Sequence, residues 1–147
     1  MKRAAWLAVA FIAFCTAPAR ADLSAARAEP NLERRAKLAL ANASTVLTAA
    51  RAAYDNGQIE KAGTLANEVG ESVRLAYDSL VATGKNPRRS PRWFKYAEIQ
   101  TRDLLRRIDA FNFDMAATDR ELLSKVKETV LELHDQLLQG LMEGKPK

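Results

Sequence analysis

The chain has 147 residues, of which 48% are hydrophobic, 28% charged and 7% aromatic. This composition is typical of one small soluble domain rich in helix, and it excludes collagen, low-complexity disorder and a multidomain enzyme. The formal net charge is +5, from 23 basic and 18 acidic residues.

Residues 1–21 have the layout of a secretory signal peptide. Lys2 and Arg3 precede an apolar run over 4–17, Pro18 ends that run, and Ala-Arg-Ala at 19–21 supplies the small residues that signal peptidase requires. The run is shorter than the roughly 20 residues that cross a bilayer. We therefore expect cleavage after Ala21, a periplasmic or secreted protein, and no stable membrane span after cleavage.

Cleavage also changes the charge and the redox chemistry of the chain. It removes Lys2, Arg3, Arg20 and the only cysteine, Cys15, and leaves 20 basic and 18 acidic residues. The mature chain can form no disulfide within itself, so its stability must come from a hydrophobic core. The small remaining excess of positive charge argues against nucleic acid as a partner.

The first part of the mature chain predicts a helical hairpin. Residues 22–30 lack a clear apolar stripe and are expected to be a flexible lead. Asn31 can cap a helix over 32–55, the turn at 56–57 ends it, and apolar residues at steps of three and four continue through 59–80. The hairpin covers 31–84. Gly63 and Gly70 lie one heptad apart in its second helix, which indicates either a close helix contact or a bend.

A basic loop over 85–90 leads to a second predicted hairpin over 91–144. We expect Ser90 to cap a helix that begins at Pro91 and ends near 113. Thr118 and Glu121 have the spacing of a capping box and precede the last helix. The predicted fold is all-α: an antiparallel four-helix bundle of two long hairpins, in one helical domain over 31–147 that follows the signal peptide and the lead.

The mature chain contains few groups that could carry out chemistry. It has one histidine, His134, no cysteine and no Gly-rich phosphate loop, so we predict no enzyme, no catalytic residue, no metal and no cofactor. Glu128, Glu132 and Asp135 line one side of the last helix and are expected to be a solvated acidic face. A metal- or haem-binding helical bundle is a further alternative, because such bundles can have this architecture.

Positive charge is concentrated in one stretch. Residues 85–107 include 8 basic and 2 acidic side chains, while acidic side chains are in excess on either side of them. The basic junction, as we name it, comprises Lys85, Arg88, Arg89, Arg92 and Lys95.

The basic junction has two interpretations. It could bind an anionic partner, such as a phosphate, an acidic polymer or a lipid headgroup, with help from the N-terminus of the following helix. Alternatively, it is a solvated loop whose cations pair with acidic neighbours and whose aromatic residues, Trp93 and Phe94, belong to the core. We favour the second interpretation because these aromatics enter a heptad stripe.

The last helix carries an apolar row beside its core stripe. This row comprises Leu131, Leu138 and Met142, with His134 next to it. In a bundle the row could simply be core between two neighbouring helices. If it is exposed, it should support self-association or docking of a protein partner. We therefore expect a non-catalytic interaction or scaffold module, with an anionic-ligand-binding module as the alternative.

Overall fold

The computed structural model describes residues 23–144, and the predicted signal peptide lies outside them. Within this range the chain is all-helical, with five helices that pack against one another and no strand. The helices are α1 (Leu23–Ala28), α2 (Leu32–Asp55), α3 (Ile59–Ala82), α4 (Arg92–Asp114) and α5 (Glu121–Glu143).

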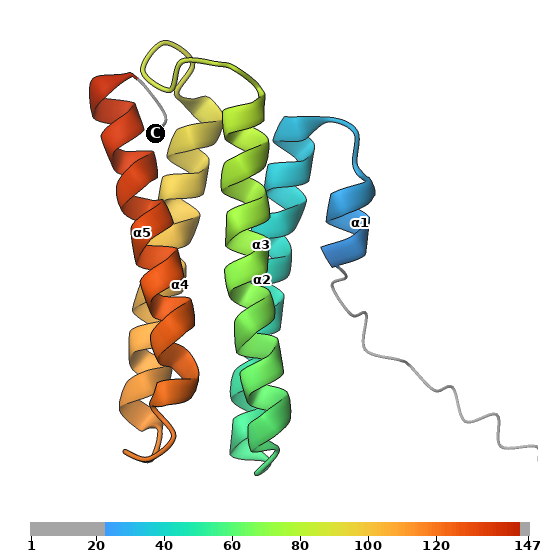
Figure 1. The fold of residues 1–147 in the computed structure, drawn as a ribbon, viewed down its shortest axis with the longest axis vertical. Helices are drawn as coiled ribbons and strands as arrows, with labels where there is room; N and C mark the ends of the chain where they lie inside the picture. The colour runs from blue at the N-terminus through green and yellow to red at the C-terminus, as the bar shows by residue number, and fades with distance from the viewer. Residues whose placement is uncertain (1–22, 145–147) are drawn as a thin grey trace, which may run out of the picture.

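The four long helices form two hairpins that lie side by side (Figure 1). Within each hairpin the helices are antiparallel, as predicted. Between the hairpins α2 lies beside α4 and α3 beside α5, and both of these pairs run in the same direction. The contacts agree with this pairing of helices, because Arg107 near the middle of α4 donates a hydrogen bond to Ser44 near the middle of α2. The prediction of an antiparallel arrangement is therefore wrong between the hairpins. The loop 83–91 connects α3 to α4, and α4 lies diagonally across from α3.

The core is built from the residues whose spacing predicted it. On α5 five apolar residues at steps of three and four are buried, namely Leu123, Val126, Val130, Leu133 and Leu137. The face of α2 consists largely of small residues, among them Ala36, Ala39, Ala43 and Ala50, all of them buried. Small side chains allow helix axes to approach closely, which explains why α2 and α3 make the most extensive contact in the molecule.

The glycines of α3 mark a close helix contact. A Cβ atom placed on Gly63 would lie 3.2 Å from Leu122 Cδ2, and one placed on Gly70 would lie 3.7 Å from Val126 Cγ2. Both neighbours belong to α5. Of the two explanations left open by the sequence, the geometry therefore favours close packing between the hairpins.

Two predicted helix starts differ from the structure. Asn86 Oδ1 accepts the backbone N–H groups of Arg88 and Arg89, which organises the turn before α4. Pro91 adopts helical angles there as the N-cap residue, without a side-chain cap, and Ser90 does not cap the helix. The predicted capping box is also absent, because Thr118 donates its hydroxyl to Asp119 and the turn 117–120 leads directly into α5. By contrast, Asn31 Oδ1 accepts the N–H of Arg34 as predicted.

The expected flexible lead is a short helix over most of its length. Leu23 and Ala26, three residues apart, are buried where α1 packs on α2. Arg27 pairs with Glu71 of α3 at 3.3 Å, and Glu29 O accepts Nε–H of Arg35 at 2.8 Å. Two apolar residues form a stripe only one turn long, so the segment carries no periodic signal although it contributes to the core.

Candidate functional site

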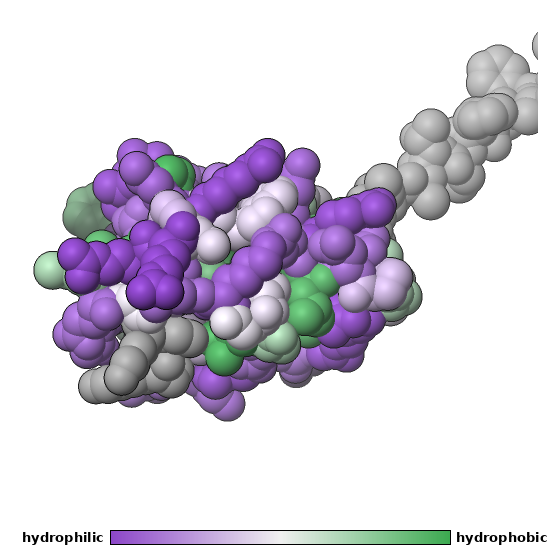
Figure 2. Space-filling model, turned by 90° about the horizontal axis from the view of Figure 1, so that it is seen from above, coloured by the Kyte–Doolittle hydropathy of each residue, from purple (hydrophilic) through white to green (hydrophobic). Residues whose placement is uncertain are grey.

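The basic junction lies at the end of the molecule that carries the loop 83–91, and we refer to this as the junction end. Figure 2 views the molecule from that end and shows hydrophilic residues over most of it. Arg88 and Arg89 lie in the loop, while Arg92 and Lys95 lie in the first turn of α4. Lys85 Nζ lies 2.6 Å from Glu33 Oε1 at the start of α2. All five junction side chains are exposed.

Most of the junction cations are not paired with a carboxylate in the part of the chain that the structure describes. Among residues 23–144, only Lys85 of these five cations forms an ion pair with a carboxylate. The prediction that the junction cations pair with acidic neighbours is therefore wrong for the other four. The aromatics do belong to the core as expected: Phe94 is buried, and the half-buried Trp93 packs edge-to-face with Tyr96.

Helix dipoles add little to this charge. Two helices, α2 and α4, begin at the junction end, whereas α3 and α5 end there. Gly144, the C-cap of α5, lies against Asn86 and the Cβ atom of Arg88. Positive N-termini and negative C-termini therefore face the same end, and their fields oppose each other. The expected help from a helix N-terminus is thus offset, and the field at this end comes from side chains.

The apolar row of α5 is exposed. Leu131 is 45% exposed, Leu138 42% and Met142 70%, so the interpretation of this row as core is wrong. His134 differs from them because it is half-buried and its Nδ1 lies 3.0 Å from Oγ1 of the buried Thr101 on α4. His134 therefore takes part in the contact between α4 and α5 and lies at the margin of the row.

Charged side chains border the row on both sides. Successive helical residues are 100° apart, so Glu128, Glu132 and Asp135 follow the row on the side of α5 that faces away from α4. We name these three exposed residues the acidic edge. The other side borders α4, where Lys127 of α5 pairs with Asp109 at 2.7 Å.

Residues on the outer side of α4 complete this face, and the sequence analysis did not single them out. Arg102 and Arg106, which we name the basic edge, are exposed and pair with Glu98 and Asp103 within their own helix. Phe113 is 81% exposed and follows Arg106 by seven residues, so the two are aligned along the helix. Arg102, Arg106 and Phe113 follow one another at steps of four and seven on the polar side of a predicted helix. This spacing was the signal in the sequence that could have placed them on one face.

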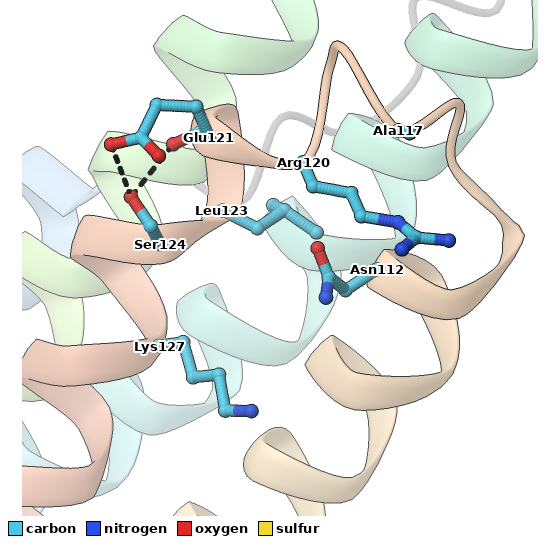
Figure 3. Close-up of a pocket in the computed structure, with 7 residues that line it drawn as sticks. All are labelled: Asn112, Ala117, Arg120, Glu121, Leu123, Ser124 and Lys127. Carbon is cyan, nitrogen blue, oxygen red and sulfur yellow. Dashed lines mark hydrogen bonds between the residues drawn. The ribbon is translucent and has the colours of Figure 1, made fainter.

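A shallow hollow of about 340 Å³ lies at the opposite end, where α4 joins α5 (Figure 3). It is lined by Asn112, Ala117, Arg120, Glu121, Leu123, Ser124 and Lys127. Ser124 Oγ lies 2.9 Å from Glu121 O and 3.0 Å from Glu121 Oε1, so this hydroxyl is engaged by the first turn of its own helix. Two of the polar residues of the hollow, Ser124 and Glu121, thus order the start of α5.

Two further findings concern metals and membranes. Within residues 23–144, no three His, Cys, Asp or Glu side chains gather closely enough to hold a metal ion. No helix in the same part of the chain has the length and apolar character needed to cross a membrane.

Comparisons with protein-family models, with curated proteins and with solved structures find no match to this chain. Function is therefore inferred from the surfaces of the molecule.

Proposed function

We propose that the chain is an exported, non-catalytic interaction protein that self-associates through the face formed by α4 and α5. The observation that carries this proposal is the exposed apolar row of Leu131, Leu138 and Met142. A contiguous apolar row on a helix loses contact with water when a partner covers it, and this favours association. In this proposal the two hairpins form a rigid four-helix bundle that presents the face.

Charge complementarity favours a second copy as the partner. When two copies are related by a two-fold axis along the helices, the outer edge of α5 in one copy faces the outer edge of α4 in the other. The acidic edge of each copy then lies opposite the basic edge of its partner, on both sides of the paired apolar rows. In the monomer these exposed arginines pair with Glu98 and Asp103 of their own helix. Ion pairs of exposed arginines within one helix contribute little, so the arginines can exchange partners with the acidic edge of a second copy. An axis perpendicular to the helices would bring like charges together, which is unfavourable. We therefore propose parallel packing.

The size of the face is adequate for such a contact. Helices α4 and α5 have 23 residues each. At 1.5 Å per residue and a spacing of 8–10 Å, they offer a face about 35 Å long and about 20 Å wide. Two such faces would bury about 1,400 Å² in total, which lies within the range of specific protein interfaces. Only the central row is apolar, so the expected dimer is reversible.

The proposal places this assembly outside the cytoplasm. It rests on the signal-like layout of residues 1–21, with Ala-Arg-Ala before the expected cleavage site. The intact mass of the exported protein should correspond to a chain that begins at Asp22. A full-length protein recovered in the membrane fraction and resistant to carbonate washing would contradict this part.

Sedimentation velocity over a range of protein concentrations tests the interface. The wild-type protein should shift from monomer to dimer as its concentration rises. Leu138→Glu should remain a folded monomer, because a carboxylate in the centre of the contact would have to lose its hydration. The matched control is Leu38→Glu on α2, since Leu38 is 43% exposed but lies outside this face. A Leu38→Glu variant that also fails to dimerise, or a monomeric wild-type protein at all concentrations, would overturn the proposal.

A further inference from the structure

We infer that the junction end is a docking surface for an anionic lipid bilayer, which the molecule meets end-on. This inference is independent of self-association and rests on different residues. The cations that carry it are Arg88, Arg89, Arg92 and Lys95, none of which forms an ion pair with a carboxylate among residues 23–144. They project from a loop and from the first turn of a helix, at one end of an elongated molecule.

The first turns of α2 add to the positive charge of this end. Arg34 and Lys37 are exposed there, close to the Lys85–Glu33 pair. The nearby Glu29 carboxylate lies 3.4 Å from Arg34, so it neutralises one of the added cations. Glu143, in the last turn of α5, is a further exposed carboxylate at this end. The cations of this end still outnumber its carboxylates.

At the far end of the molecule, positive and negative side chains of the described residues are more evenly matched. There Arg51 pairs with Asp114, and Lys61 and Arg120 lie among exposed acidic residues. These acidic residues are Asp55, Glu60 and Glu121. The molecule is therefore electrically polar along its length, and an anionic surface would orient it with the junction end forward.

The arrangement of the cations favours a surface over a small anion. A site for a single phosphate group would converge several donors on one point, whereas these side chains are exposed on a loop and on a helix turn. The Arg92 guanidinium also lies over the ring of the half-buried Trp93, 5.2 Å from its centroid. A half-buried tryptophan with a guanidinium over its ring is suited to the headgroup region of a bilayer.

The expected strength follows from the number of cations. Each Lys or Arg close to an anionic bilayer contributes about fivefold to the partition coefficient. Four of them predict a preference of several hundredfold for anionic over neutral vesicles at low salt. The preference should fall steeply with salt, because the screening length decreases from about 10 Å at 0.1 M to about 3 Å at 1 M.

Vesicle co-sedimentation tests the inference with the purified exported protein. Vesicles of phosphatidylcholine alone are compared with vesicles that also contain phosphatidylglycerol. The wild-type protein should sediment only with the anionic vesicles, and 1 M salt should release it. The triple variant Arg88→Glu/Arg89→Glu/Arg92→Glu should lose at least about 100-fold in partition coefficient while its helix content, measured by circular dichroism, is unchanged.

A charge-matched control separates local from total charge. The variant Lys61→Glu/Arg120→Glu/Lys125→Glu alters the net charge equally, but its residues lie within the first five residues of α3 and α5 or just before α5, at the far end. It should keep most of the vesicle binding. An equal loss in both triple variants would overturn the inference, as would wild-type binding to polyphosphate without binding to anionic vesicles. Unfolding of the junction variant would also contradict it, because its arginines would then be structural.

Discussion

Gly70 of α3 lies opposite Val126 of α5 at a distance that leaves room for one more carbon atom. A Cβ atom on Gly70 would meet Val126 Cγ2 at 3.7 Å, which is an ordinary van der Waals contact. At Gly63, one heptad earlier, the corresponding distance to Leu122 Cδ2 is only 3.2 Å. The same contact between the hairpins is therefore tighter at the start of α3 than in its middle.

This difference predicts the effect of replacing each glycine with alanine. Gly70→Ala should raise the free energy of unfolding by about 0.5–1 kcal/mol, because alanine loses less backbone entropy in a helix. Gly63→Ala should give a smaller gain, since the end of the Leu122 side chain must move by a few tenths of an ångström. Urea unfolding of both variants tests the order. A loss of stability in Gly70→Ala would show that α3 and α5 are closer at this position than the 3.7 Å distance implies.

Arg107 joins the two hairpins through its guanidinium. Its Nη1 and Nη2 atoms donate to Ser44 Oγ at 2.7 Å, Ser44 O at 3.0 Å and Thr48 Oγ1 at 2.8 Å. Arg107→Ala should lower the free energy of unfolding by about 1.5–3 kcal/mol, the range for hydrogen bonds to charged groups. Arg107→Lys should recover only part of this, because an ammonium lacks the planar arrangement of donors.

Arg106→Ala is the control for this prediction, measured by the same chemical unfolding. Its side chain is 80% exposed and, among residues 23–144, pairs only with Asp103 in its own helix. The change in stability should stay within about 0.5 kcal/mol. Equal effects at positions 106 and 107 would contradict a specific role for Arg107 between the hairpins.

The stability of the fold should decrease at high pH because of Tyr77. Burial raises the pKa of this phenol above its ordinary value of 10.0, and the charges of Asp78 and Glu132 raise it further. Above pH 10 the unfolded chain therefore releases the Tyr77 proton more readily than the folded chain does. The contribution of Tyr77 is fully present below pH 10 and is lost as the pH rises through the pKa of the folded state.

Unfolding measurements on both sides of pH 10 test this pH dependence. Tyr77→Phe lacks the titrating group, so its stability should fall less steeply with pH than that of the wild-type protein. Identical slopes for the two proteins would contradict the raised pKa.

Much of the fold could be predicted because its main elements repeat. Residues such as Val73, Leu104 and Val130 lie on stripes several turns long, and a regular spacing of three and four specifies both the helix and its buried face. The Asn31 cap was also predictable, since its side chain acts within four residues. Short-range patterns failed where a competing local bond existed, as at Thr118, whose hydroxyl is bonded to Asp119.

The relation between the hairpins could not be predicted. Whether α3 lies beside α5 or beside α4 depends on the path of the loop 83–91, and no local pattern specifies that path. This relation determines which sides of α4 and α5 remain exposed, and it places Arg102 and Asp135 at opposite edges of one face. The charge complementarity of that face was therefore not visible in the sequence.

The most direct test of the central claim, parallel self-association through α4 and α5, is sedimentation velocity of two charge-reversed variants. One is Arg102→Glu/Arg106→Glu, which makes both edges acidic, and the other is Glu128→Lys/Asp135→Lys, which makes both edges basic. Each variant alone should be monomeric at concentrations where the wild-type protein is dimeric, because like edges repel. An equimolar mixture should form a dimer that contains one copy of each. A mixture that stays monomeric while the wild-type protein dimerises would contradict the account.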